Sequence, residues 1–198
     1  MTTTRETTTT DITTIRIGHH AGAVEALSGA FFDDPVFRWV FPDDERRRAV
    51  LPGFFDVFTR AIGRHGVSLE TSDGTGAALW VPPGEEVTED EDAFGEALIG
   101  LSPVDGDRLM ACMELLGETH PQEPCWYLNL LGVAPDHQGH GVGSALLKAA
   151  LDRADRDGVR AYLEATSEQN RRLYERHGFV ATAELRLPDG PSLWAMWR

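Results

Sequence analysis

The sequence is poor in cysteine, has no long apolar run and carries too few positive charges to balance its acids. Its two cysteines, Cys112 and Cys125, cannot form a disulfide framework in 198 residues, and they lack the spacing of metal ligands. No apolar stretch comes near the ~20 residues that a membrane-spanning helix requires. We therefore expect reduced thiols, a cytoplasmic location, no membrane partner and no bound metal.

The acidic side chains clearly outnumber the basic ones. Aspartate and glutamate number 32 against 18 lysines and arginines, which gives a formal net charge of -14. Such a field repels the phosphate backbone of nucleic acids and favours cationic small molecules, although acidity can also serve solubility alone. We expect a small-molecule partner and no nucleic acid.

The length is that of one globular domain, and 41% of the residues are hydrophobic, enough to bury a core. The threonine-rich residues 1–12 lack the apolar segment of a signal peptide, and we expect them to form a flexible tail. Residues 13–198 are then the folded domain. No feature of the sequence sets the oligomeric state, so both a monomer and a homodimer stay open.

The spacing of apolar residues predicts a mixed α/β (α+β) fold with one central sheet of about six or seven strands flanked by helices. The segment Trp126 to Val133 is almost continuously apolar between two prolines, which is typical of a central strand buried on both faces. Helices are predicted over 20–32, 43–65, 92–100, 104–119, 144–156 and 169–177. Strands are predicted over 13–17, 67–71, 76–81, 126–133, 159–165, 179–187 and 193–198.

A glycine-rich segment, Gln138-Gly139-His140-Gly141-Val142-Gly143, lies between the predicted central strand and a predicted helix. Backbone amides at such a helix start, together with the helix dipole, favour a bound anion such as a pyrophosphate. The G-x-G-x-x-G dinucleotide fingerprint is absent because position 144 is serine, and no Gly-Lys-Ser/Thr of a Walker loop follows. Taken alone, the segment could equally be a turn that packs a helix onto a strand.

Two motifs follow one another along the chain: Gly132-Val133-x-Pro135-x-x-Gln138-Gly139-x-Gly141-x-Gly143 and Asn170-x-x-x-Tyr174-Glu175-x-x-Gly178-Phe179. In this order and spacing they resemble the GNAT (GCN5-related N-acetyltransferase) superfamily of acyl-CoA-dependent N-acetyltransferases. The resemblance covers residues 126–179. It implies acetyl-CoA as the cofactor and a strand that splays from its parallel neighbour to form the acyl-CoA site.

The resemblance also implies which residues hold the cofactor. The glycine loop would bind the pyrophosphate, and the exposed backbone of the splayed strand would bind the pantetheine arm. Backbone amides there would also polarise the thioester carbonyl. The implied cofactor-binding residues are Leu131, Gly132, Val133, Gln138, Gly139, His140, Gly141, Val142, Gly143, Ser144, Asn170 and Tyr174.

Tyr174 is the catalytic residue that the resemblance implies, as the proton donor to the departing thiolate. A tyrosine with its ordinary pKa near 10 is protonated at neutral pH and can play this part. The base that deprotonates the amine stays open, because the strand at 126–133 contains no carboxylate. The alternatives are Glu164, Glu70, an acid of the Asp33-Asp34 loop, or water alone.

In this superfamily the first helices and their loop build most of the acceptor pocket. Here that region places several aromatic residues beside two acids, which suits an apolar amine with a cationic group. The same aromatics could instead be core residues, and the acids could cap a turn. The substrate-binding candidates are Phe31, Asp33, Asp34, Phe37, Trp39, Trp80 and Asn129.

The expected function is the transfer of an acetyl group from acetyl-CoA to a primary amine of a small molecule, directly and within one ternary complex. The C-terminal half also resembles an antibiotic-acetylating branch of the superfamily, so an antibiotic or a related metabolite is a candidate acceptor. The alternative is a non-catalytic acyl-CoA-binding module that acts as a sensor or binds a protein partner.

Overall fold

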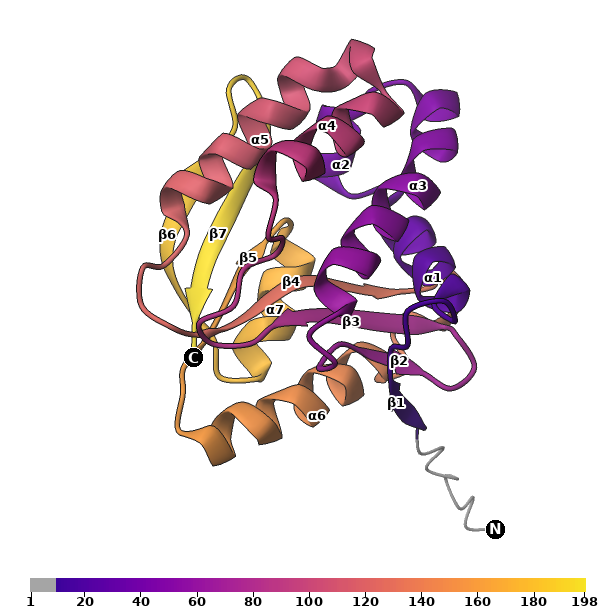
Figure 1. The fold of residues 1–198 in the computed structure, drawn as a ribbon. Helices are drawn as coiled ribbons and strands as arrows, with labels where there is room; N and C mark the ends of the chain where they lie inside the picture. The colour runs from indigo at the N-terminus through magenta and orange to yellow at the C-terminus, as the bar shows by residue number, and fades with distance from the viewer. Residues whose placement is uncertain (1–9) are drawn as a thin grey trace, which may run out of the picture.

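The computed structural model describes residues 10–198, and its centre is one sheet of seven strands in the order β1-β2-β3-β4-β5-β7-β6 (Figure 1). Only β4 and β5 run parallel, and every other neighbouring pair is antiparallel. This confirms the predicted mixed sheet. The strands are β1 (Ile12–Thr14), β2 (Leu69–Thr71), β3 (Gly76–Val81), β4 (Trp126–Val133), β5 (Ala161–Ala165), β6 (Val180–Arg186) and β7 (Ser192–Trp197).

Helices cover both faces of the sheet. In Figure 1, α1 and α3 lie on one side and α6 lies on the other, and a separate apolar core fills the space on each side. Single 3-10 turns occupy Pro103–Asp105 and Pro135–His137. The helices are α1 (Ala21–Phe31), α2 (Pro35–Val40), α3 (Asp44–Gly63), α4 (Glu91–Leu101), α5 (Gly106–Thr119), α6 (Val142–Asp157) and α7 (Glu168–Arg176).

The sequence prediction missed one helix, α2. The predicted helices cover 20–32 and 43–65, whereas Asp34 and Pro35, which lie between them, start a further helix. The carboxylate of Asp34 accepts hydrogen bonds from the backbone amides of Val36 and Phe37, and Pro35 occupies the first helical position, where its missing N–H does no harm. The residues that separate α1 from the next helix thus also form the N-terminal cap of that helix.

β4 leaves β5 part of the way along its length. The two strands pair only from Trp126 to Leu128, although β4 continues for five more residues. At the same place β4 carries a bulge, because Leu79 of β3 pairs with Leu130 and Trp80 pairs with Leu128, so that Asn129 has no partner. A bulge bends its strand and increases the local twist. The expected splayed parallel pair is present, and the bulge supplies its physical cause.

Beyond the bulge, β4 is held by β3 on one edge and by α1 on one face. A Cβ atom added to Gly132 would lie 2.9 Å from the Cβ of Ala30 and 3.0 Å from Cδ2 of Leu27, both on α1. Glycine at this position therefore lets α1 pack directly on the strand backbone. The other edge of this part of β4 has no strand partner and is open to a ligand.

At the N-terminus, residues 1–9 of the predicted tail lie outside the described residues. Ile12, which was assigned to that tail, lies in β1 and pairs with Thr71. No helix in residues 10–198 is long and apolar enough to cross a membrane.

Candidate functional site

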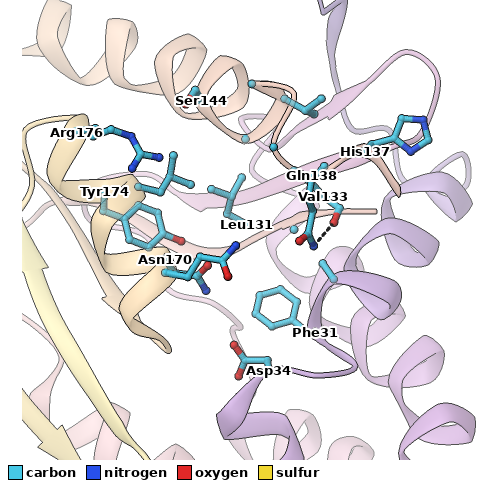
Figure 2. Close-up of a pocket in the computed structure, with 18 residues that line it drawn as sticks. Phe31, Asp34, Leu131, Val133, His137, Gln138, Ser144, Asn170, Tyr174 and Arg176 are labelled. Atoms are coloured by element: carbon cyan, nitrogen blue, oxygen red, sulfur yellow. Dashed lines mark hydrogen bonds between the residues drawn. The ribbon is translucent and has the colours of Figure 1, made fainter. Parts of the chain in front are cut away.

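A cavity of about 340 Å³ lies where β4 splays, and Figure 2 shows the side chains around it. The open end of β4 forms its floor, the glycine loop and the start of α6 close one end, and α7 faces α1 across it. The structure thus brings together every residue that the sequence assigned to the cofactor except His140. The lining residues are Ala30, Phe31, Asp34, Leu131, Gly132, Val133, His137, Gln138, Gly139, Gly141, Val142, Gly143, Ser144, Gln169, Asn170, Leu173, Tyr174 and Arg176.

The start of α6 presents free backbone amides to this cavity. Gly139 and Gly141 have φ angles of +76° and +89°, a conformation that side-chain-bearing residues rarely adopt. No side chain caps the helix, and its first turn contains no acid, so the amides there are not satisfied by the helix itself. Oriented amides and the positive end of the helix dipole suit an anion. This geometry fits the pyrophosphate of coenzyme A.

Gln138 stabilises the loop rather than pointing its side chain at the anion position. Its Nε2 donates to the carbonyl oxygen of Val133 at 3.0 Å, which ties the loop back to the end of β4 (Figure 2). At the other side of the loop, the hydroxyl of Ser144 lies 3.0 Å from Nε2 of His177, which joins the start of α6 to the end of α7. Both contacts hold the glycine backbone in place.

Arg176 lines this cavity and was not named from the sequence. It is exposed, it makes no ion pair with any residue in 10–198, and it is the only lysine or arginine that lines this cavity. It lies one position beyond the matched glutamate of the second motif, and α7 carries several arginines, so spacing alone did not distinguish it. Its place in Figure 2, near Ser144, suits a contact with an anionic ligand.

Three polar side chains link the helix α2 to α7 beneath the cavity. The Thr166 hydroxyl donates to Oδ2 of Asp34, and Nδ2 of Asn170 donates to the Thr166 hydroxyl at 3.3 Å. The backbone amide of Asn170 donates to Ser167 at the start of α7. Burial raises the pKa of Asp34 to about 6, although its hydrogen bonds with Thr166 and the start of α2 oppose the rise. Asn170 is therefore held in position by its backbone amide and Nδ2, and its Oδ1 has no hydrogen-bond partner in the described residues.

Tyr174 lies one helical turn after Asn170 and reaches the same space. Its ring is buried against Phe179, with 6.0 Å between the ring centroids, whereas its hydroxyl makes no hydrogen bond to any residue in 10–198. Burial, with a smaller contribution from the charge of Asp34, raises the pKa of Tyr174 above its ordinary value. The hydroxyl is therefore protonated at neutral pH and is free to donate a hydrogen bond.

A second, smaller cavity of about 110 Å³ adjoins the first and is predominantly apolar. It lies between the aromatic side chains of α1 to α3, helix α5, and the middle of β4 and β5. The two cavities share Phe31, Leu131, Asn170 and Tyr174. The other lining residues are Val36, Phe37, Val40, Phe41, Phe54, Phe58, Leu109, Cys112, Met113, Leu116, Tyr127, Leu128, Asn129, Leu130, Glu164, Thr166 and Leu193.

Glu164 is the single carboxylate that lines this second cavity. Its Oε2 accepts a hydrogen bond from the Tyr127 hydroxyl at 2.9 Å, and its Oε1 is shielded from solvent without a hydrogen-bond partner in the described residues. Burial raises its pKa to about 7, and the neighbouring tyrosine hydroxyls limit the rise. Glu164 thus takes up and releases a proton near neutral pH.

The structure decides between some of the open alternatives. Glu70 lies on β2, opposite Thr13 and Ala77, and lines neither cavity. Asp34 lines the cofactor cavity but uses both carboxylate oxygens to cap α2 and to hold Thr166. Glu164 alone combines a free buried oxygen with a place in the second cavity.

The acceptor candidates named from the sequence divide into three groups. Phe31, Phe37 and Asn129 line the second cavity, and Asp34 lines only the cofactor cavity. Three others line neither cavity: Asp33 is exposed beside the cap residue, Trp39 stacks against the Arg108 guanidinium, and Trp80 is fully buried between the sheet and α6. Trp80 was misplaced because alternate residues of β3 face opposite sides of the sheet.

Comparisons with known proteins agree with this geometry. The model of a family described as the acetyltransferase (GNAT) family matches residues 73–179. An uncharacterized N-acetyltransferase of Schizosaccharomyces pombe is 28% identical over 171 residues, which are 80% of this chain and 69% of that protein. A mycothiol acetyltransferase of Beutenbergia cavernae is 40% identical over 101 residues, which are 49% of this chain but only 33% of that protein.

Solved structures share the fold along almost the whole chain. The crystal structure of a histone acetyltransferase and related acetyltransferase from Corynebacterium glutamicum has a TM-score of 0.69 and 27% identity, with 95% of this chain and 94% of that chain covered. An arylalkylamine N-acetyltransferase of Aedes aegypti, at 16% identity, has a TM-score of 0.60 and covers 94% of this chain and 97% of its own. At that identity the second likeness concerns the fold alone.

Proposed function

Because this chain belongs to the acetyltransferase (GNAT) family and uses acetyl-CoA as its acetyl donor, we propose that it acetylates a primary amine of a small molecule by direct transfer. The observation that carries the proposal is the common wall of the two cavities. A donor in the larger cavity and an amine in the smaller one would both contact Leu131, Asn170 and Tyr174. The amine can then attack without an acetylated enzyme in between.

The two cysteines support direct transfer over an acyl-enzyme. Cys112 lines the second cavity, but burial raises its pKa to about 12, and burial likewise raises the pKa of Cys125 to about 11. The thiolate, not the thiol, is the nucleophile, and neither residue forms one near neutral pH. No other side chain in the cavity is an activated nucleophile.

Acetyl-CoA, when bound, supplies an acetyl group activated as a thioester. The free amides at the start of α6 and the guanidinium of Arg176 would hold its phosphates, and the open edge of β4 would hold its arm. In the overall reaction an N–C bond forms and a C–S bond breaks. The acceptor ammonium loses two protons, one to the thiol product and one to solvent.

We assign Glu164 as the base that takes the first of these protons. An ammonium group with a pKa near 10 gives up its proton to a carboxylate of pKa about 7 more readily than to an ordinary glutamate with a pKa of 4.5, by roughly 3 kcal/mol. Glu164 lies in the cavity that would contain the amine, and its hydrogen bond with Tyr127 fixes its orientation. The exchange with solvent then regenerates the carboxylate.

We assign Tyr174, which belongs to the wall common to both cavities, as the acid that protonates the leaving thiolate. Its hydroxyl keeps its proton at neutral pH and has no competing partner in the described residues, so it can donate that proton to a leaving group. Asn170, fixed by Thr166, would position the donor beside it. The proposed base and acid thus both line the smaller cavity, which would contain the amine.

Thiol release from acetyl-CoA, measured against a panel of primary amines, tests the proposal. The panel contains puromycin, polyamines, aminoglycosides and peptide N-termini, and Tyr174→Phe is assayed in parallel. Puromycin is included because the C-terminal segments look like those of puromycin N-acetyltransferase, an antibiotic-resistance enzyme. We expect turnover with at least one amine, and a kcat roughly 10- to 100-fold lower in Tyr174→Phe with little change in CoA affinity.

Two results contradict the proposal. Tight CoA binding without turnover of any amine argues for a binding module rather than an enzyme of small amines. A wild-type kcat in Tyr174→Phe removes the assigned proton donor, whatever the acceptor.

A further inference from the structure

The smaller cavity continues to the surface through a wider one of about 500 Å³, which we call the mouth. The mouth is lined by residues of α3 to α5, by the segment before α4 and by the loop that follows α5. It shares Phe58, Met113, Leu116, Tyr127 and Asn129 with the smaller cavity, so the two cavities adjoin, and we refer to them together as the channel. Opposite the reacting end, this channel therefore opens to solvent between acidic and apolar elements.

The side chains that line the mouth carry net negative charge, although the guanidinium of Arg64 lies outside it and donates to the backbone carbonyl of Glu86 at 3.2 Å. Glu86 and Glu91 line the mouth, both are exposed, and neither makes an ion pair with a residue in 10–198. Neighbouring acids do find partners, since Glu85 lies near His65 and Glu89 near Arg64. Of the four glutamates Glu85, Glu86, Glu89 and Glu91, the two without an ion pair to a described residue are therefore the two that line the mouth.

No positive side chain offsets these two acids within the channel. Neither the mouth nor the smaller cavity is lined by lysine or arginine. The only basic group there is His120, and burial lowers its pKa, although the charge of Glu86 opposes this shift. His120 packs on Tyr127, with 4.7 Å between the ring centroids, as an aromatic wall.

The inner end of the channel independently calls for a hydrogen-bond donor. Oδ1 of Asn129 and Oε1 of Glu164 are both shielded from solvent and make no hydrogen bond in the described residues. The Tyr162 hydroxyl, which is also buried without a partner among these residues, lies near Glu164 and lowers its pKa, so Asn129 Oδ1 is the clearer case of an unmet acceptor. A buried polar atom without a partner is unfavourable unless a ligand or water satisfies it. Between this end and the mouth the lining is apolar, mainly Phe54, Phe58 and Met113.

These features fit one class of ligand, and they deepen the proposed function, on which this inference rests. We propose that the acceptor is a dication, with a reacting primary amine at Glu164 and a second ammonium or guanidinium group between Glu86 and Glu91. An apolar chain or an aromatic ring joins the two groups and lies along the phenylalanines. The second cation takes no part in bond making. Acetylation removes one of the two charges, so the product binds the channel less well than the substrate.

Matched pairs of acceptors test this class directly. We would compare 1,4-bis(aminomethyl)benzene with 4-methylbenzylamine, and straight-chain diamines with monoamines of equal length, by kcat/KM at low salt. The variant Glu86→Gln/Glu91→Gln removes both mouth charges. The control Asp92→Asn/Glu96→Gln removes two exposed charges of α4 that do not line the channel, so the net charge of both variants is equal.

The wild-type protein is expected to prefer the best diamine over its monoamine by roughly tenfold. That preference should fall about fivefold or more in the mouth variant and persist in the control, as exposed ion pairs of modest strength predict. Equal kcat/KM for every pair in the wild-type protein, or an equal loss in both variants, overturns the inference.

Calorimetry separates this inference from the proposed function. If no amine is acetylated, the proposed function fails, yet the binding of 1,4-bis(aminomethyl)benzene can still be measured. Weaker binding by the mouth variant than by the control then supports a dication site. Absent binding, or equal binding by both variants, contradicts it.

Discussion

The two cavities offer opposite charges to the ligands that we propose for them, and they do so by different means. In the cofactor cavity the positive potential comes from backbone amides at the start of α6, with Arg176 as the only lysine or arginine in the lining. In the acceptor channel the negative potential comes from side-chain carboxylates, Glu164 inside and Glu86 and Glu91 at the mouth. The CoA phosphates would thus be bound mainly by backbone amides, and the amine by side-chain carboxylates. The two sites should therefore respond to different kinds of substitution.

Glu164→Gln should have the largest effect, because it removes the base but keeps the shape of the acceptor cavity. We expect kcat to fall by roughly 10²- to 10³-fold at pH 7, with CoA affinity unchanged. Since the pKa of Glu164 is about 7, wild-type kcat/KM should decline as the pH falls below 7 and the carboxylate is protonated. That limb should be missing from the pH profile of the variant. If kcat/KM of the variant declines below pH 7 as in the wild type, the decline is due to another group.

The same substitution should change how stability depends on pH. Burial raises the pKa of Glu164 from 4.5 to about 7, so the folded state binds this proton more tightly than the unfolded state. Its contribution therefore destabilises the fold as the pH rises from about 5 to 8, by roughly 2 to 3 kcal/mol. Urea unfolding at several pH values should give a shallower decline for Glu164→Gln. The exposed Glu114→Gln should decline like the wild type.

Two glycines at opposite ends of α6 allow a matched test of backbone recognition. Gly141 and Gly158 both have positive φ angles, +89° and +66°, so alanine at either position strains the backbone. Both Gly141→Ala and Gly158→Ala should lower the melting temperature. Only Gly141→Ala should weaken CoA binding, by roughly tenfold, because only Gly141 lines the cofactor cavity. Equal CoA affinities would contradict the assigned anion site.

Arg176 should have the smallest effect, since it adds an exposed side-chain charge to a site made of amides. Arg176→Gln is expected to weaken CoA binding roughly threefold at low salt, and the difference should vanish at high salt. Arg172→Gln, an exposed neighbour on α7 outside the cavity, is the control. A salt-independent loss, or an equal loss in the control, would show that charge is not what Arg176 contributes.

The same difference explains why the sequence predicted one cavity better than the other. A backbone site requires glycines at fixed spacing next to a strand and a helix, and this leaves a local motif, seen here from Gly132 to Gly143. The central strand was equally readable, because its apolar run has the length and bounds of β4. Both features depend only on residues that are near one another in the chain.

The acceptor channel, by contrast, is assembled from segments far apart in the sequence. Glu164 could be named only as one of several possible bases, because its hydrogen bond with Tyr127 depends on the pairing of β4 with β5. One signal was available: it is the single charged residue in a strand that is otherwise apolar on both faces. Trp80 was named as an acceptor residue, but it lies on the face of β3 that α6 covers. The sequence does not show which helix covers which face of the strand.

The wall common to both cavities also bears on how such an enzyme can diversify. Phe31, Leu131, Asn170 and Tyr174 contact both spaces, so a substitution there that admits a new acceptor also disturbs the donor. Residues of the mouth touch only one of the two. We expect natural variants with altered amine preference to differ mainly at the mouth and along the phenylalanines, while the shared wall drifts little. Residues of the mouth can thus change with the acceptor, whereas residues of the shared wall are constrained by the donor as well.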